Sequence, residues 1–105
     1  MLLEVDVDEG ANLAVLRGEL DLSSVETLAS AVRPLVARGG SLEIDMEAVR
    51  FVDSTGLRGL LSLVEKLGPH GRVTIVRPRR DLCRLMDILG LRGRFELVDP
   101  ESPCD

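Results

Sequence analysis

The chain has 105 residues, 45% of them hydrophobic, and a formal net charge of −5 at pH 7, so it has room for one small domain with a single core. The negative charge argues against general binding of polyanions, and two Phe as the only aromatic residues leave no stacking platform for nucleic acid. No apolar run reaches the roughly 20 residues of a membrane span. Acidic residues also follow Met1-Leu2-Leu3 at once, unlike a signal peptide. We therefore expect a cytoplasmic protein that neither binds nucleic acid nor inserts directly into a membrane.

The first third of the chain predicts a β-hairpin followed by a helix. Residues 3–7 alternate apolar and polar side chains, and residues 13–16 form a second strand after a turn that contains Gly10. Residues 23–26, Ser-Ser-Val-Glu, have the spacing of a capping box and predict a helix N-terminus. The apolar stripe of this helix consists of Val25, Leu28, Val32, Leu35 and Val36. We expect Pro34 to kink the helix or loosen its last turn, because proline has no N–H to donate.

Strands and helices continue to alternate along the rest of the chain. Residues 42–46, 73–76 and 95–98 predict three more strands. Two helical stripes lie between them: Leu57, Leu60, Leu61, Val64 and Leu67, and then Leu82, Leu85, Met86 and Leu89. Glycine-containing stops, Gly68-Pro69 and Gly90, end these helices. The order predicts an α/β fold in which helices cover a mixed, mostly parallel sheet, and residues 99–105 form a polar C-terminal tail.

Charged residues and cysteines are unevenly placed. Residues 1–30 carry seven acidic side chains against a single arginine, whereas residues 71–94 carry seven arginines against two aspartates. This asymmetry indicates either solvated faces that partly neutralise each other or a docking patch for a partner. Cys83 falls in a helical stripe and Cys104 in the polar tail, which predicts neither a disulfide framework nor a metal site.

The stretch Asp53-Ser54-Thr55-Gly56-Leu57 joins an apolar-rich run to a helical stripe. A hydroxyl residue at this point is an N-cap signal, so Ser54 is expected where a loop meets a helix N-terminus at the surface. A phosphate there would meet free N–H donors and the positive end of the helix dipole, and would add a charge of about −1.5 to −2. From the residues alone, Ser54 is either a plain helix cap or a phosphoacceptor.

Residues 49–57, Val-Arg-Phe-Val-Asp-Ser-Thr-Gly-Leu, closely resemble the phosphorylation segment of bacterial anti-sigma factor antagonists, which are free-standing STAS domains. Residues 16–21, Leu-Arg-Gly-Glu-Leu-Asp, resemble a second signature of that family, and a looser one runs through residues 82–97. The resemblance covers nearly the whole chain. It implies a STAS domain over residues 1–98, with a mixed sheet whose helices lie mainly on one face.

The same resemblance implies a switch that works by exclusive binding. The unphosphorylated chain would sequester an anti-sigma factor that is also a serine kinase, and so release the sigma factor for transcription. The kinase would then use ATP to phosphorylate Ser54, and a serine phosphatase would reset the switch. The residues implied for partner binding are Asp21, Asp53, Ser54, Thr55, Gly56 and Arg58.

Several of these residues have a second, structural interpretation. Asp21 is either a cap at a strand exit or part of the docking surface, and Asp53 either helps to cap the helix or is recognised by the kinase. Thr55 is expected to be a cap or packing residue, and Gly56 to permit a bend or a close backbone approach. The family usually continues Gly-Leu-Gly, whereas this chain has Arg58 at the last position, where it can pair with a phosphoserine or an acidic partner residue.

Enzyme alternatives fail on spacing. A nucleophile elbow needs a glycine where Val52 stands, and an extra residue separates Asp53 from Gly56 relative to the Asp-(Ser/Thr)-Gly of dimeric aspartic proteases. The single histidine, His70, lies in a turn, and the sequence has no Walker lysine and no zinc cluster. We therefore expect a binding protein without catalysis, cofactor or metal. The alternative function is a STAS-only accessory subunit of a membrane transporter.

Overall fold

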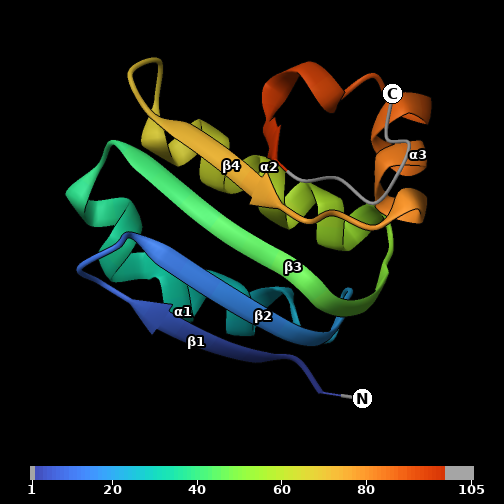
Figure 1. Cartoon of the computed structure of the whole chain (residues 1–105), viewed down its shortest axis with the longest axis horizontal. Coiled ribbons are helices and arrows are strands. Elements are labelled where there is room, and N and C mark those ends of the chain that lie inside the picture. Colours follow the sequence, from blue (N-terminus) through green and yellow to red (C-terminus); the bar gives the residue numbers. More distant parts are fainter. Residues whose placement is uncertain (1, 99–105) are drawn as a thin grey trace.

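Figure 1 shows the computed structural model of the chain, in which residues 2–98 are described. Its sheet has the strand order β1-β2-β3-β4-β5. The strands are β1 (Glu4–Asp8), β2 (Leu13–Leu20), β3 (Ser41–Val52), β4 (Arg72–Val76) and β5 (Glu96–Val98). β1 pairs antiparallel with β2, and each later neighbouring pair is parallel. The expected hairpin and the mixed, mostly parallel sheet are therefore confirmed.

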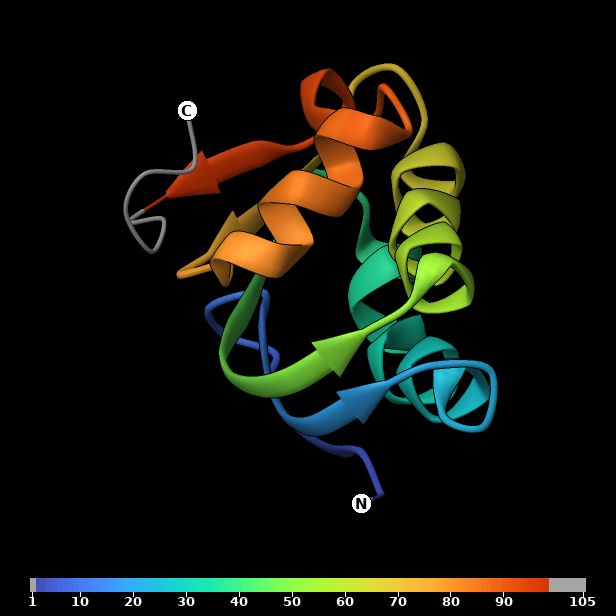
Figure 2. The same ribbon diagram turned by 90° about the vertical axis from the view of Figure 1, so that its right-hand side faces the viewer.

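Two helices, α1 (Val25–Arg38) and α2 (Ser54–Leu67), cover one face of this sheet. The third helix, α3 (Arg80–Ile88), lies apart from them and is followed by a short 3₁₀ helix, η1 (Arg92–Arg94). In Figure 1 the viewer looks onto the uncovered face, with α1 and α2 behind the strands; Figure 2 shows these two helices packed together on one side. The arrangement confirms the α/β fold expected from the alternation of strands and helices.

The core between sheet and helices is almost entirely aliphatic, as the shortage of aromatic residues requires. Alternate residues of β2 point into it, starting with Ala14 and Leu16, because successive side chains of a strand point to opposite faces. The largest fully buried side chains are Leu16, Leu20, Leu28, Val32, Leu35, Leu42, Ile44, Met46, Leu57, Leu60, Ile75 and Met86. Leu63, outside the predicted stripe of α2, is also buried.

The uncovered face of the sheet carries charged side chains in ion pairs. Arg17 on β2 pairs with Glu4 and Asp6 of the neighbouring strand β1. On the same face, toward the opposite edge of the sheet, Arg72 of β4 pairs with Glu96 of β5, with 2.6 Å between nitrogen and oxygen. These partners are neighbours in the sheet, and neither pair joins the acidic residues of 1–30 to the arginines of 71–94.

β3 is longer than its apolar pattern predicts. The predicted strand ends at residue 46, whereas the observed one continues to Val52. Its pairing with β2 shifts register twice, between Val15 and Arg17 and between Gly18 and Glu19, so β3 contributes extra residues at both points. Such bulges bend a strand and interrupt its alternation, which is why the second half of β3 does not read as a strand from the sequence.

One local prediction for α1, the capping box, is wrong. The helix has no capping box: Ser24 is the N-cap, and its side chain makes no capping hydrogen bond. Pro34 lies inside the helix, which continues to Arg38. Proline therefore removes one hydrogen bond without ending the helix, because the buried residues Leu28 and Leu35 hold both turns against the core.

The prediction for the cysteines is also corrected. Cys83 is buried in α3 as expected, but it is disulfide-bonded. Cys104 and the predicted polar tail at residues 99–105 lie outside the described residues.

Candidate functional site

The carboxyl ends of β2 and β3 lie side by side and lead into α1 and α2 (Figure 2). Leu20, the last residue of β2, pairs with Val52, the last residue of β3. The backbone N–H of Asp53 donates to the Leu20 carbonyl at 3.3 Å. The turn that begins at Asp21 and the loop that begins at Asp53 are therefore neighbours, although 32 positions separate them in the sequence. This juxtaposition brings Asp21 close to the Ser54 loop.

The start of α2 is capped by Asp53. The Asp53 backbone is extended, and its carboxylate accepts a hydrogen bond from the Gly56 N–H at 2.8 Å. A carboxylate at this position satisfies an orphan N–H and favours the positive end of the helix dipole. The expectation that Ser54 is the N-cap is therefore wrong by one residue, and the capping interpretation of Asp53 is confirmed.

Ser54 is the first residue of α2, and its side chain is exposed. Within residues 2–98 its hydroxyl makes no hydrogen bond, because the cap is already supplied by Asp53. The first N–H groups of a helix have no partner within the helix, so an oxygen-rich group on Ser54 would meet free donors. The neighbouring Thr55 is half-buried. The structure thus presents one hydroxyl to solvent at the beginning of α2.

Gly56 is buried where the first turn of α2 meets the end of β2. A Cβ atom at this position would lie 2.2 Å from the Leu20 carbonyl oxygen and 2.8 Å from its carbon. Both atoms belong to the backbone and have little room to move. The close-approach interpretation of Gly56 is confirmed, and the contact fixes the position of Ser54 relative to β2.

Asp21 organises the turn between β2 and α1. Its carboxylate accepts hydrogen bonds from the Ser23 N–H at 3.0 Å and the Ser23 hydroxyl at 2.7 Å. The hydroxyl of Ser23 is the main cause of a pKa for Asp21 below its ordinary value. The turn therefore holds Asp21 as a carboxylate next to the Ser54 loop.

Ser24, which sequence reasoning placed in a capping box, has a different role. Its side chain is buried and its hydroxyl donates to the Glu19 carbonyl at 2.7 Å. The same oxygen accepts a hydrogen bond from the Asp21 N–H at 3.0 Å. Ser24 thus closes the turn across β2 and fixes the backbone of Asp21. The Ser-Ser pair was a visible signal, but only the fold shows which serine faces inward.

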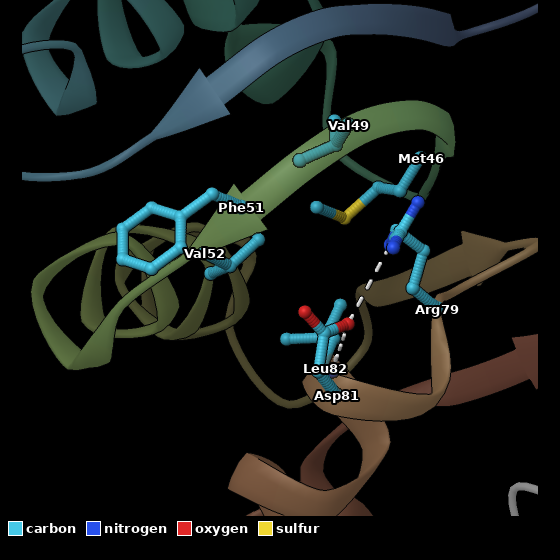
Figure 3. Close-up of a pocket in the computed structure, with 7 residues that line it drawn as sticks. All are labelled: Met46, Val49, Phe51, Val52, Arg79, Asp81 and Leu82. Carbon is cyan, nitrogen blue, oxygen red and sulfur yellow. Dashed lines mark hydrogen bonds and ion pairs between the residues drawn. The ribbon is translucent and has the colours of Figure 1, made fainter.

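Two exposed apolar residues near the carboxyl ends of β2 and β3 were not identified from the sequence. Leu22, next to Asp21, is 75% exposed, and Phe51, near the end of β3, is 47% exposed. In Figure 3 the Phe51 ring lies on the outer side of a group that also includes Met46 and Leu82. The space within this group is about 10 Å³, roughly one water molecule, so it is no site for an organic ligand. Leu22 and Phe51 thus add exposed apolar area near the carboxyl ends of β2 and β3.

Arg58 lies one helical turn after Ser54 and is exposed.

Among residues 2–98, no group of three or more His, Cys, Asp or Glu side chains is arranged to hold a metal ion. Within the same range, no helix is both long enough and apolar enough to span a membrane.

Comparison with known proteins places the chain in one family. A family model described as Mlab, STAS domain, matches residues 5–99. The anti-sigma-B factor antagonist of Bacillus subtilis (strain 168) is 34% identical over 102 residues, which cover 92% of each chain. The anti-sigma-F factor antagonist RsfB of Mycobacterium tuberculosis (strain CDC 1551 / Oshkosh) is 33% identical over 98 residues, covering 90% of this chain and 80% of RsfB.

A solved structure agrees with these relatives. The crystal structure of an anti-sigma factor antagonist from Mycobacterium paratuberculosis has a TM-score of 0.78 at 28% identity, and the match covers 97% of this chain and 90% of the other. The chain therefore belongs to the STAS domain family and, within it, to the bacterial anti-sigma factor antagonists.

Proposed function

We propose that this protein is a phosphorylation-controlled anti-sigma factor antagonist in which Ser54 is the switch. The observation that carries the proposal is the exposed Ser54 hydroxyl at the start of α2, left without a hydrogen bond in residues 2–98 because Asp53 caps the helix. A kinase can reach such a hydroxyl without unfolding the helix. The named relatives, antagonists of anti-sigma factors B and F, support the same function.

The unphosphorylated protein binds the anti-sigma factor through the surface around Ser54. Leu22 and Phe51 supply exposed apolar area, and Asp21 and Asp53 supply fixed carboxylates. Apolar contacts flanked by ordered polar groups are the usual composition of a specific interface. Because Gly56 holds α2 against β2, the surface is rigid before the partner arrives, which lowers the entropy cost of binding.

Phosphorylation ends this binding. The partner, acting as a serine kinase, transfers the γ-phosphoryl group of ATP to the Ser54 oxygen, and ADP and the hydroxyl proton are released. The product carries about −1.5 to −2 of added charge on a surface that already has the carboxylates of Asp21 and Asp53, and this charge repels a partner that fits the neutral serine. A serine phosphatase removes the phosphate and restores binding. In this proposal the chain is a substrate and a binding protein rather than an enzyme, and it acts in the cytoplasm.

The experiment that tests the proposal is the intact mass of the purified protein before and after incubation with candidate kinases from the same cell and ATP. We expect a gain of one phosphate that is absent from Ser54→Ala. The matched control is Thr55→Ala, which removes the neighbouring hydroxyl and should still gain the phosphate. Phosphate on Thr55, or none with any soluble kinase, contradicts the proposal; the second result would favour the transporter-accessory alternative.

Binding to the same kinase provides the second half of the test. Ser54→Ala should bind it and remain bound in the presence of ATP, whereas Ser54→Asp should bind at least about tenfold more weakly, a loss of about 1.4 kcal/mol. Equal affinities for the two variants would show that charge at position 54 does not control binding.

A further inference from the structure

Arg58 and Ser54 occupy the same face of α2. Residues four apart in a helix are surface neighbours, with Cβ atoms about 5–6 Å apart. Both side chains are exposed. In residues 2–98 Arg58 makes no ion pair or hydrogen bond, whereas Arg17 and Arg77 are each held by two carboxylates. Arg58 is therefore available to a negative charge placed on Ser54.

The position of Arg58 is unfavourable for the helix as it stands. The first turn of α2 contains no acidic residue, and a cation near a helix N-terminus is repelled by the helix dipole. The nearest fixed negative charge on this segment, the carboxylate of Asp53, is already bonded to the Gly56 N–H. A phosphate on Ser54 would remove this repulsion, because it would be attracted both by the guanidinium and by the free N–H groups of the first turn.

Resting on the proposed phosphorylation of Ser54, we propose that Arg58 is the positioning residue for the phosphate and binds its oxygens within the same molecule. The guanidinium fork and the N-terminal N–H groups then hold the phosphate against α2. The formal charge of Asp53, Ser54 and Arg58 together changes from zero to about −1.5 to −2. The phosphate thus makes a formally neutral patch anionic, and Arg58 keeps the phosphate ordered against α2 instead of leaving it mobile in solvent.

The competing role for Arg58 is contact with an acidic group of the partner. The internal pairing is favoured because the spacing of the two residues brings them together in the isolated chain, with no further component. The two roles separate experimentally, since only the internal one changes the titration of the phosphate in the absence of a partner.

The test is a ³¹P NMR titration of the full chain with phosphoserine at position 54, installed either by a kinase or during synthesis. We expect the second pKa of the phosphate to be lower in the native sequence than in Arg58→Gln by roughly 0.3–0.7 pH units, the size of an exposed ion pair. Lys66→Gln, which removes a positive charge at the other end of α2, should titrate like the native sequence. Arg58→Lys should restore part of the shift but lose the two-point geometry.

A difference below about 0.1 pH unit between the native chain and Arg58→Gln would overturn the proposal. If, in addition, unphosphorylated Arg58→Gln bound the kinase at least about tenfold more weakly, Arg58 would be a partner contact instead. Failure of the proposed function is recognised separately, because the intact-mass experiment does not depend on Arg58. The titration of installed phosphoserine, in turn, requires no kinase.

Discussion

At the scale of single residues, the site shows a division of labour between neighbouring side chains. Asp53 satisfies the helix N-terminus, which leaves the Ser54 hydroxyl exposed and unbonded within the described residues. Ser23 and Ser24 likewise hold the side chain and backbone of Asp21. Local hydrogen bonds therefore fix the carboxylates on both sides of the Ser54 loop, and under the proposed function a phosphate on Ser54 would add charge to a surface that is already ordered.

Asp21 gives a prediction on pH. Its pKa in the folded chain is below the ordinary value of 3.8, so folding favours the carboxylate. The resulting stabilisation is present above that value and is lost as the pH falls through the lowered pKa. As the pH is lowered from about 5 to about 3, the free energy of unfolding measured with urea should therefore fall more for the native chain than for Asp21→Asn. Glu65→Gln, which removes an exposed carboxylate from α2, is the control and should follow the native chain. Identical pH profiles for the native chain and Asp21→Asn would show that the turn does not depend on this carboxylate.

At the scale of elements, the position of Ser54 depends on how α2 meets β2. The two register shifts bend β3 so that it ends beside the end of β2 (Figure 2). Gly56 then allows the first turn of α2 to touch the Leu20 backbone. The geometry of Ser54 relative to Asp21 is therefore a property of two strands and two helix starts, not of the Asp-Ser-Thr-Gly motif alone.

Gly56→Ala tests this contact. The added methyl group would overlap the Leu20 carbonyl, so the first turn of α2 must shift, and we expect a loss of roughly 1–3 kcal/mol in the free energy of unfolding. Gly93→Ala is a matched control, because a Cβ atom at Gly93 has no neighbour within 4 Å. Urea denaturation of both variants measures the difference. Equal stabilities would mean that the close approach at Gly56 carries no constraint.

At the scale of the whole molecule, one aliphatic core holds the surface around Ser54 in place. Helices α1 and α2 cover one face of the sheet (Figure 1), and the aliphatic core lies beneath them. The uncovered face carries the ion pairs of Arg17 and Arg72. Exposed ion pairs of this kind contribute about 0–1 kcal/mol each, whereas a buried leucine contributes several times more. The rigidity of the edge that carries Ser54 therefore comes from apolar burial beneath α2.

The contribution of apolar burial is tested by comparing alanine variants of Leu60 and Ile88. Leu60 of α2 is fully buried, so Leu60→Ala should destabilise the protein by about 2–5 kcal/mol through lost burial and the cavity left behind. Ile88, at the end of α3, is 72% exposed, and Ile88→Ala should cost less than about 0.5 kcal/mol. Thermal and urea unfolding of the two variants give the comparison. A similar loss in both would mean that the core is not confined to the layer between helices and sheet.

The sequence by itself determined the order of strands and helices, the apolar stripes and the segment that carries Ser54. These features are encoded locally, since the period of the apolar residues distinguishes helix from strand, and a polar residue before a stripe marks a helix start. Gly56 was also interpretable, because a glycine at a helix start indicates a close approach or a bend. The stop of α3 at Gly90 was predicted for the same local reason, and its φ of 69° agrees with a left-handed C′ position.

Only the tertiary structure decided which residue caps α2, how far β3 extends and what surrounds Ser54. The shifts in register between β2 and β3 depend on pairing between residues far apart in the chain, so no local pattern reports them. The same pairing brings Asp21 beside the Ser54 loop and leaves Leu22 and Phe51 exposed at one edge. Exposure and juxtaposition are properties of the packed chain, because each depends on which other segments cover a residue.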